Sequence, residues 1–191
     1  AMIGNSQFYD IWIKDSTIRT FQTLDFLPPT LKCDKNVFNT FQGFRINNIK
    51  EYNDNGYDYN IYLKHLKAIT GNDECYEYMI KYIDHLVEKP GEKIDICIVI
   101  KSNQIIGKNI FFEKFAEYIL GKNYILQTSK IDEVIGRFNQ NVNKLMVIMD
   151  EMNAKSGFSN SDIIKDLITT ETLNWERKGV DGVIIKNLAR G

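Results

Sequence analysis

The chain has 191 residues, of which 43% are hydrophobic, which suits one domain, or one with a small companion, and excludes a disordered chain. Its 24 basic and 25 acidic side chains give a net charge of −1, which excludes a globally basic nucleic-acid coat. The three cysteines are widely separated, which argues against a disulfide framework and fits a reducing compartment. Neither they nor the two histidines have the spacing of zinc ligands. No apolar run approaches the length of a membrane span, so we expect no membrane partner.

The N-terminal segment, residues 1–56, is rich in aromatic side chains and irregular in pattern. The pair Pro28-Pro29 interrupts any regular element, since proline lacks the backbone N–H group that helices and sheets use. We therefore expect short strands and turns here, packed against a neighbouring domain.

Residues 57–90 form a predicted helical subdomain. Apolar side chains recur at helical spacing over 59–69, and Gly71 supplies a helix stop. The same spacing recurs over 76–87, and Pro90-Gly91 ends that second helix. Both stripes indicate helices whose apolar faces pack into the core.

The pattern changes in residues 91–191, for which we predict an α/β P-loop NTPase core with a parallel sheet. Residues 94–100 are β-branched and almost wholly apolar, as in a buried strand of a parallel sheet. A polar loop, 101–107, separates this strand from an amphipathic helix over 111–120, which Gly121 closes.

Further strands and helices continue the α/β pattern. Leu145–Met149 predicts a second buried strand, and a helix is expected over 163–168. The runs 172–178 and 183–186 predict a hairpin that turns at Asp181-Gly182, a pair typical of tight turns.

The junction between the first strand and its helix has the length of a phosphate-binding loop. Such a loop needs backbone N–H groups around the phosphate, a mobile lysine and the N-terminus of a helix. Two departures from G-x-x-x-x-G-K-[ST] occur: Ser102 replaces the first glycine, and Asn109 replaces the hydroxyl that binds magnesium. Asn109 can still offer an amide oxygen. The predicted nucleotide-binding positions are Ser102, Asn103, Gln104, Ile105, Ile106, Gly107, Lys108 and Asn109.

The second strand ends in two adjacent carboxylates, Asp150 and Glu151. In P-loop enzymes the first such acid holds the magnesium shell, and the second orients and deprotonates the attacking water. The predicted site therefore assigns Lys108 to the phosphates, Asp150 with Asn109 to Mg²⁺, and Glu151 to the catalytic base of ATP hydrolysis.

Several fragments, in order, resemble superfamily 3 helicases, in particular the poxvirus-type NTPases joined to primases in large DNA viruses, phages and plasmids. The segment before Walker B, the Walker B end and the extra motif beyond it all have counterparts in this chain. The fragments are Phe38–Phe44, Ile106–Phe111, Gly136–Asn139, Met149–Glu151 and Leu167–Asp181.

The resemblance implies an AAA+ type ATPase that assembles as a homo-hexamer, translocates on single-stranded DNA and can follow a primase domain. It places Arg177 and Lys178, on the hairpin after Walker B, against the DNA backbone, a contact that is independent of sequence. It also implies a cytoplasmic location, in the host cell or at a viral replication site.

The family's sensor asparagine and arginine finger have no clear counterpart before residue 191, so we expect a core incomplete at its C-terminus. An arginine finger is worth about 10³–10⁵ in rate in related enzymes, and we therefore expect this chain alone to hydrolyse ATP weakly. Two alternatives stay open. An inactive P-loop docking or assembly module fits Ser102 and Asn109, whereas a small-molecule kinase would need a lid with several arginines.

Overall fold

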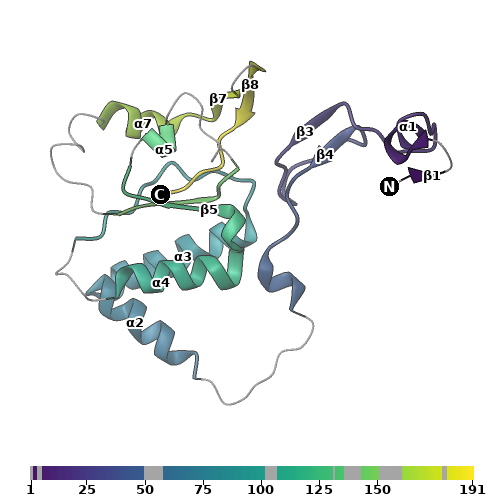
Figure 1. Cartoon of the computed structure of the whole chain (residues 1–191). Coiled ribbons are helices and arrows are strands. Elements are labelled where there is room, and N and C mark those ends of the chain that lie inside the picture. The colour runs from purple at the N-terminus through teal and green to yellow at the C-terminus, as the bar shows by residue number, and fades with distance from the viewer. Residues whose placement is uncertain are drawn as a thin grey trace.

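The computed structural model describes residues 2–3, 6–49, 58–101, 107–130, 132–135, 143–150, 161–177 and 180–191. Three layers make up the main body (Figure 1): helices α2, α3 and α4 on one face, a central sheet, and α5, α7 and the β7–β8 hairpin on the other. Within the described part of the chain, no helix is both long and apolar enough to cross a membrane.

The N-terminal region contains short strands and turns, as its sequence predicted. Its elements are β1 (Met2–Ile3) paired antiparallel with β2 (Ser6–Gln7), α1 (Phe8–Trp12), β3 (Thr23–Asp25) paired parallel with β4 (Val37–Asn39), and the 3-10 turn η1 (Arg45–Asn48). Aromatic rings attach this region to the main body. Phe41 stacks on Tyr124 with ring centroids 5.2 Å apart, and Phe26 and Phe44 are buried beside them.

Helices α2 (Asn60–Thr70) and α3 (Asp73–Glu88) confirm the two predicted helices. Gly71 ends α2 with a positive φ of 77°, a conformation that glycine adopts without steric cost. Asn72 then caps α3, because its side chain accepts a 2.7 Å hydrogen bond from the N–H of Cys75. Chain reversal at 71–72 lets the apolar faces of both helices pack together.

The sheet is parallel where its strands are paired. Strand β5 (Ile125–Thr128) pairs in parallel with β6 (Met146–Met149), and Met146 forms a parallel bridge with Arg190. On the far side of this C-terminal segment, the N–H of Ile98 donates to the carbonyl of Gly191 at 3.1 Å. The order across the sheet is therefore β5, β6, the C-terminal segment and the segment around Ile98.

The expectation of a buried strand over residues 94–100 was wrong. The segment lies at the edge of the sheet without regular strand structure, and Val99 is 86% exposed. Among the described residues, the Ile98 to Gly191 bond is the segment's only backbone hydrogen bond to the sheet, and a β-ladder needs more than one. Apolar composition alone does not distinguish an edge segment from a central strand.

The helix after this segment is α4 (Lys108–Phe115), which continues as the π-helical turn η2 (Ala116–Leu120) and ends at Gly121, as expected. The short 3-10 turn η3 (Lys122–Tyr124) leads into β5, and α5 (Asp132–Ile135) follows it. The main core lies between α3, α4 and the sheet and includes Leu86, Phe115, Leu120 and Leu145.

Helix α7 (Ser161–Thr169) and the antiparallel hairpin of β7 (Thr172–Arg177) and β8 (Val180–Lys186) confirm the last predicted elements. The predicted position of the turn was wrong. Asp181 and Gly182 lie within β8, because Arg177 pairs with Val180 and the strands are joined at residues 178–179. Those two joining residues lie outside the described ones.

Candidate nucleotide-binding site

The predicted phosphate loop ends in a conformation suited to binding an anion. Gly107 is in the left-handed region (φ 78°, ψ 19°) and precedes the first residue of α4, Lys108. The N–H of Phe111 donates to the Gly107 carbonyl at 3.1 Å, which closes the first turn. Lys108 and Asn109 thus occupy the N-terminal turn of α4, the end of a helix whose dipole favours an anion. Positions Ser102, Asn103, Gln104, Ile105 and Ile106 lie outside the described residues.

Helix α4 is held in place by aromatic packing from α2. Tyr62 stacks on the buried Phe111 with ring centroids 4.2 Å apart, and its hydroxyl donates to the Phe111 carbonyl at 3.2 Å. Burial raises the pKa of the Tyr62 hydroxyl above its usual value of 10. The start of α4 therefore has a fixed position relative to the helical layer.

Asp150 directly follows β6, as predicted, and is linked to α4 through one side chain. The Nε2 amide of Gln127 on β5 donates to Asp150 Oδ2 at 2.7 Å and to Glu113 Oε1 at 2.8 Å. The N–H of Asp150 also donates to the Thr128 carbonyl at 2.9 Å. The end of β6 and the helix that begins at Lys108 therefore lie side by side, joined by a shared amide.

The magnesium site predicted at Asp150 and Asn109 stays a prediction. Within the described residues, no group of three or more His, Cys, Asp or Glu side chains could hold a metal. Mg²⁺ does not require such a group, because it is usually bound by one or two carboxylates together with water and substrate phosphates. If Mg²⁺ binds here, the Asp150 carboxylate, whose Oδ2 accepts the Gln127 bond, and the Asn109 amide oxygen on α4 would be its protein ligands.

Of three other predicted site residues, the structure describes only the backbone of one. Glu151 and Lys178 lie outside the described residues. Arg177 is the last residue of β7 and pairs with Val180 beside a β-bulge, so its backbone lies at the end of the hairpin. The assignments of these three residues stay predictions.

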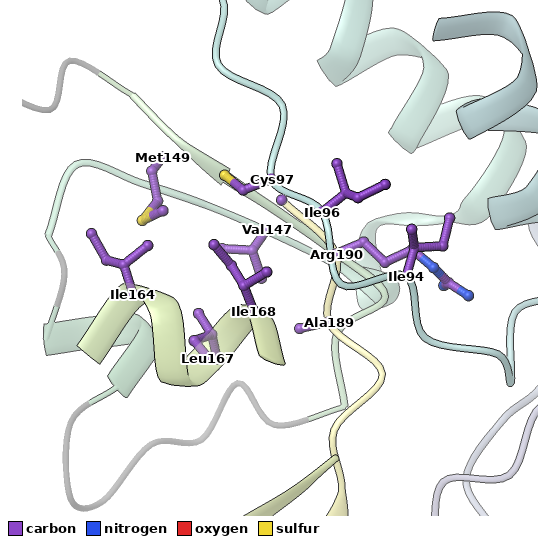
Figure 2. Close-up of a pocket in the computed structure, with 11 residues that line it drawn as sticks. Ile94, Ile96, Cys97, Val147, Met149, Ile164, Leu167, Ile168, Ala189 and Arg190 are labelled. Atoms are coloured by element: carbon purple, nitrogen blue, oxygen red, sulfur yellow. The ribbon is translucent and has the colours of Figure 1, made fainter. Parts of the chain in front are cut away.

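An apolar pocket lies elsewhere, between α7 and the sheet. Figure 2 shows Ile164, Leu167 and Ile168 of α7 facing Val147 on β6, and Ile94 and Cys97 are among the other residues that line the pocket. Burial raises the pKa of the Cys97 thiol. The pocket contains no catalytic residue that the sequence predicted, and its lining belongs to the packing of α7 on the sheet.

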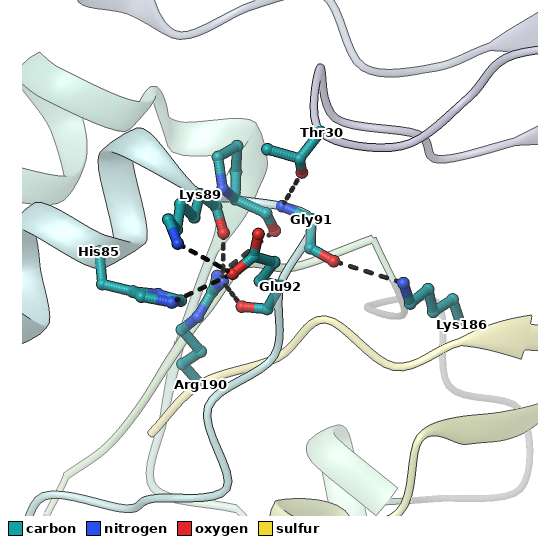
Figure 3. A network of polar contacts seen from close by, with 8 residues as sticks. Thr30, His85, Lys89, Gly91, Glu92, Lys186 and Arg190 are labelled. Atoms are coloured by element: carbon teal, nitrogen blue, oxygen red, sulfur yellow. Dashed lines mark hydrogen bonds and ion pairs between the residues drawn. The ribbon is translucent and has the colours of Figure 1, made fainter.

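Arg190 was not predicted to have a role, yet its side chain is only 1% exposed. Its guanidinium donates to the carbonyls of Lys89 at 2.9 Å, Pro90 at 3.5 Å and Glu92, at the end of α3 (Figure 3). Burial lowers its pKa to about 10. These three carbonyls lie in the turn that follows α3, so Arg190 joins the end of α3 to the sheet.

Asn187 has a comparable structural role beside Arg190. Its Nδ2 group donates to the carbonyls of Leu167 and Thr170 at 2.8 and 2.9 Å, and Lys93 Nζ donates to the same two oxygens at 2.7 Å each. Burial lowers the pKa of Lys93. Both side chains therefore hold the C-terminal end of α7 against the sheet.

Comparison with known proteins supports the fold and leaves the family open. A family model described as "Family of unknown function (DUF5906)" matches residues 100–190, and no curated protein matches the chain in sequence. Three apo structures of the NrS-1 C-terminal region are similar, with TM-scores of 0.68, 0.72 and 0.66 at 20%, 18% and 18% identity. They cover 87%, 93% and 87% of this chain, which spans 41%, 43% and 40% of theirs.

Proposed function

We propose that this chain is part of a replication-related primase–helicase and that residues 91–191 form its ATP-binding motor core. The similarity in fold to the NrS-1 C-terminal region supports the broader part of this proposal. The observation that carries the finer part is the Gln127 bridge between Glu113 on α4 and Asp150 after β6. The bridge joins the second turn of α4, the helix that begins after the Gly-Lys pair, to a carboxylate at the end of a parallel strand, the edge where ligands bind in open α/β sheets.

Each side chain would have a distinct task in this site. Backbone N–H groups after Gly107 and the Lys108 ammonium group would bind the nucleotide phosphates. Asp150 and Asn109 would hold Mg²⁺, which bridges phosphate oxygens and offsets their negative charge when bound. Gln127 would keep the Asp150 carboxylate oriented towards α4. Glu151 would orient and deprotonate the attacking water.

Single-stranded DNA is the proposed second ligand, bound at the end of the β7–β8 hairpin. Arg177 ends β7 and Lys178 follows it, and six copies of this hairpin in a homo-hexamer would concentrate positive charge that the near-neutral chain lacks. Replacing both residues by alanine should weaken binding of single-stranded DNA of any sequence and make that binding less dependent on salt. Unchanged anisotropy titrations would contradict this assignment.

The docking-module hypothesis makes the opposite prediction about nucleotide. It expects no Mg-ATP binding and no effect of Lys108→Ala. The proposal is tested by thermal unfolding with and without Mg-ATP, because a ligand at 100 times its dissociation constant stabilises the native state by about 2.7 kcal/mol. Asp150→Asn should keep the fold and lose the part of this stabilisation that depends on Mg²⁺. Equal midpoints with and without nucleotide would favour the docking module.

A further inference from the structure

His65 of α2 lies against Gly107, the glycine of the predicted phosphate loop, although the sequence showed only that this histidine lacks the spacing of a metal ligand. A Cβ atom on Gly107 would lie 2.8 Å from His65 Nε2 and 2.9 Å from Cε1. Real Cβ atoms essentially never make contacts below 3.0 Å, so a side chain at 107 would require the imidazole to move out of the space that it occupies. Gly107 is thus restricted twice, by this ring and by its φ of 78°.

Helix α2 also contacts the first turn of α4 through neighbouring rings. His65 meets Phe111 edge-on, with ring centroids 6.3 Å apart and an interplanar angle of 87°. One turn earlier on α2, Tyr62 stacks on the Phe111 ring and donates its hydroxyl to the Phe111 carbonyl. Since Phe111 N–H in turn donates to the Gly107 carbonyl, α2 supports both ends of that turn.

We propose that His65 is a positioning residue for the phosphate-binding loop, whose imidazole holds the Gly107–Lys108 turn in the conformation that receives nucleotide phosphate. This inference rests on the proposed function of the loop. It links the helical layer to the nucleotide site, because a displacement of Gly107 cannot occur in the direction of α2 without moving the His65 ring. Occupancy of the site and the position of α2 therefore depend on each other.

The consequence for affinity follows from preorganisation. Without the ring, the backbone at Gly107 gains freedom that nucleotide binding must remove, and glycine has more of that freedom than any other residue. Fixing one such residue corresponds to about a tenfold change in affinity. We therefore expect His65→Ala to raise the Kd for Mg-ADP about tenfold, and His65→Gln, which restores bulk and a nitrogen near Nε2, to recover part of it.

The experiment is a calorimetric titration of the wild-type chain and its variants with Mg-ADP, well below each unfolding midpoint. Lys67→Ala is the matched control on the same helix, since it removes an ion pair between α2 and Asp73 of α3 and none of the contacts with α4 described above. This control should lower stability and keep the wild-type Kd. If His65 had only a structural role, His65→Ala would likewise lower stability and keep the wild-type Kd. A Kd of His65→Ala within twofold of the wild-type value would therefore overturn the inference.

A double-mutant cycle tests the contact itself. Gly107→Ala should weaken binding severely, and adding His65→Ala should restore part of the affinity because the steric conflict is removed while the φ strain stays. Additive effects would contradict the contact between the two residues. Absence of Mg-ADP binding by the wild-type chain would contradict the proposed function and this inference together, whereas wild-type binding with an unaffected His65→Ala contradicts the inference alone.

Discussion

The shared amide of Gln127 gives a quantitative test of how the site is assembled. Replacing Gln127 by glutamate substitutes a third carboxylate for the group that donates to both Glu113 and Asp150. Two unit charges 4 Å apart in water repel each other by about 1 kcal/mol, so two new pairs contribute about 2 kcal/mol before screening. Physiological salt reduces this for exposed groups, and loss of the two hydrogen bonds adds to it. We expect Gln127→Glu to destabilise the chain by about 1–3 kcal/mol.

Urea unfolding measures this change, and Gln22→Glu is the matched control because Gln22 is an exposed glutamine outside the site. Added Mg²⁺ should stabilise Gln127→Glu more than the control, since three neighbouring carboxylates attract a divalent cation. High salt should reduce the difference between the two variants. Equal stability of Gln127→Glu and Gln22→Glu at low salt would refute the arrangement of Gln127 between two carboxylates.

Two further predictions concern the contacts that hold α3 to the sheet. Burial raises the pKa of Tyr82 in the folded chain above its usual value of 10, so above pH 10 the folded chain keeps a proton that the unfolded chain loses. The free energy of unfolding should therefore fall as the pH rises above 10. Tyr82→Phe should remove about 1.4 kcal/mol per pH unit from that slope, which urea unfolding at alkaline pH measures. An unchanged slope would contradict this account. Arg190→Met should cost about 2–4 kcal/mol of unfolding free energy, because three carbonyls near the end of α3 lose their buried donor, and a loss below about 0.5 kcal/mol would show that water replaces it.

Much of the fold could be predicted from local sequence pattern. Helical spacing and Gly71 located α2 and α3, and the apolar run before Asp150 located β6. The Asp181-Gly182 pair correctly predicted a hairpin but not the position of its turn. The register, and with it the turn, is fixed by cross-strand pairs such as Trp175 with Val183, which a dipeptide preference does not reveal. The prediction for residues 94–100 was wrong because apolar composition does not show whether neighbouring strands pair with a segment and cover it.

The candidate site was predictable only in part, because its key contacts join residues far apart in sequence. The Gly-Lys pair and Asp150 follow from motifs, and the structure places each of them next to its expected element. Gln127 carries no motif, and its role depends on β5 lying between α4 and Asp150 in space. The contact of His65 with Gly107 likewise depends on how α2 packs, which local pattern does not encode.

The central claim, that this chain binds nucleotide at the Gly107–Lys108 turn, is tested most directly by calorimetric titration with Mg-ATP. The wild-type chain is compared with Lys108→Ala and with Lys114→Ala, a control on the same helix that removes an exposed ion pair with Glu117. We predict binding by the wild type and by Lys114→Ala, and its loss in Lys108→Ala. Equal heats for all three proteins, or no binding by the wild type, would contradict the claim.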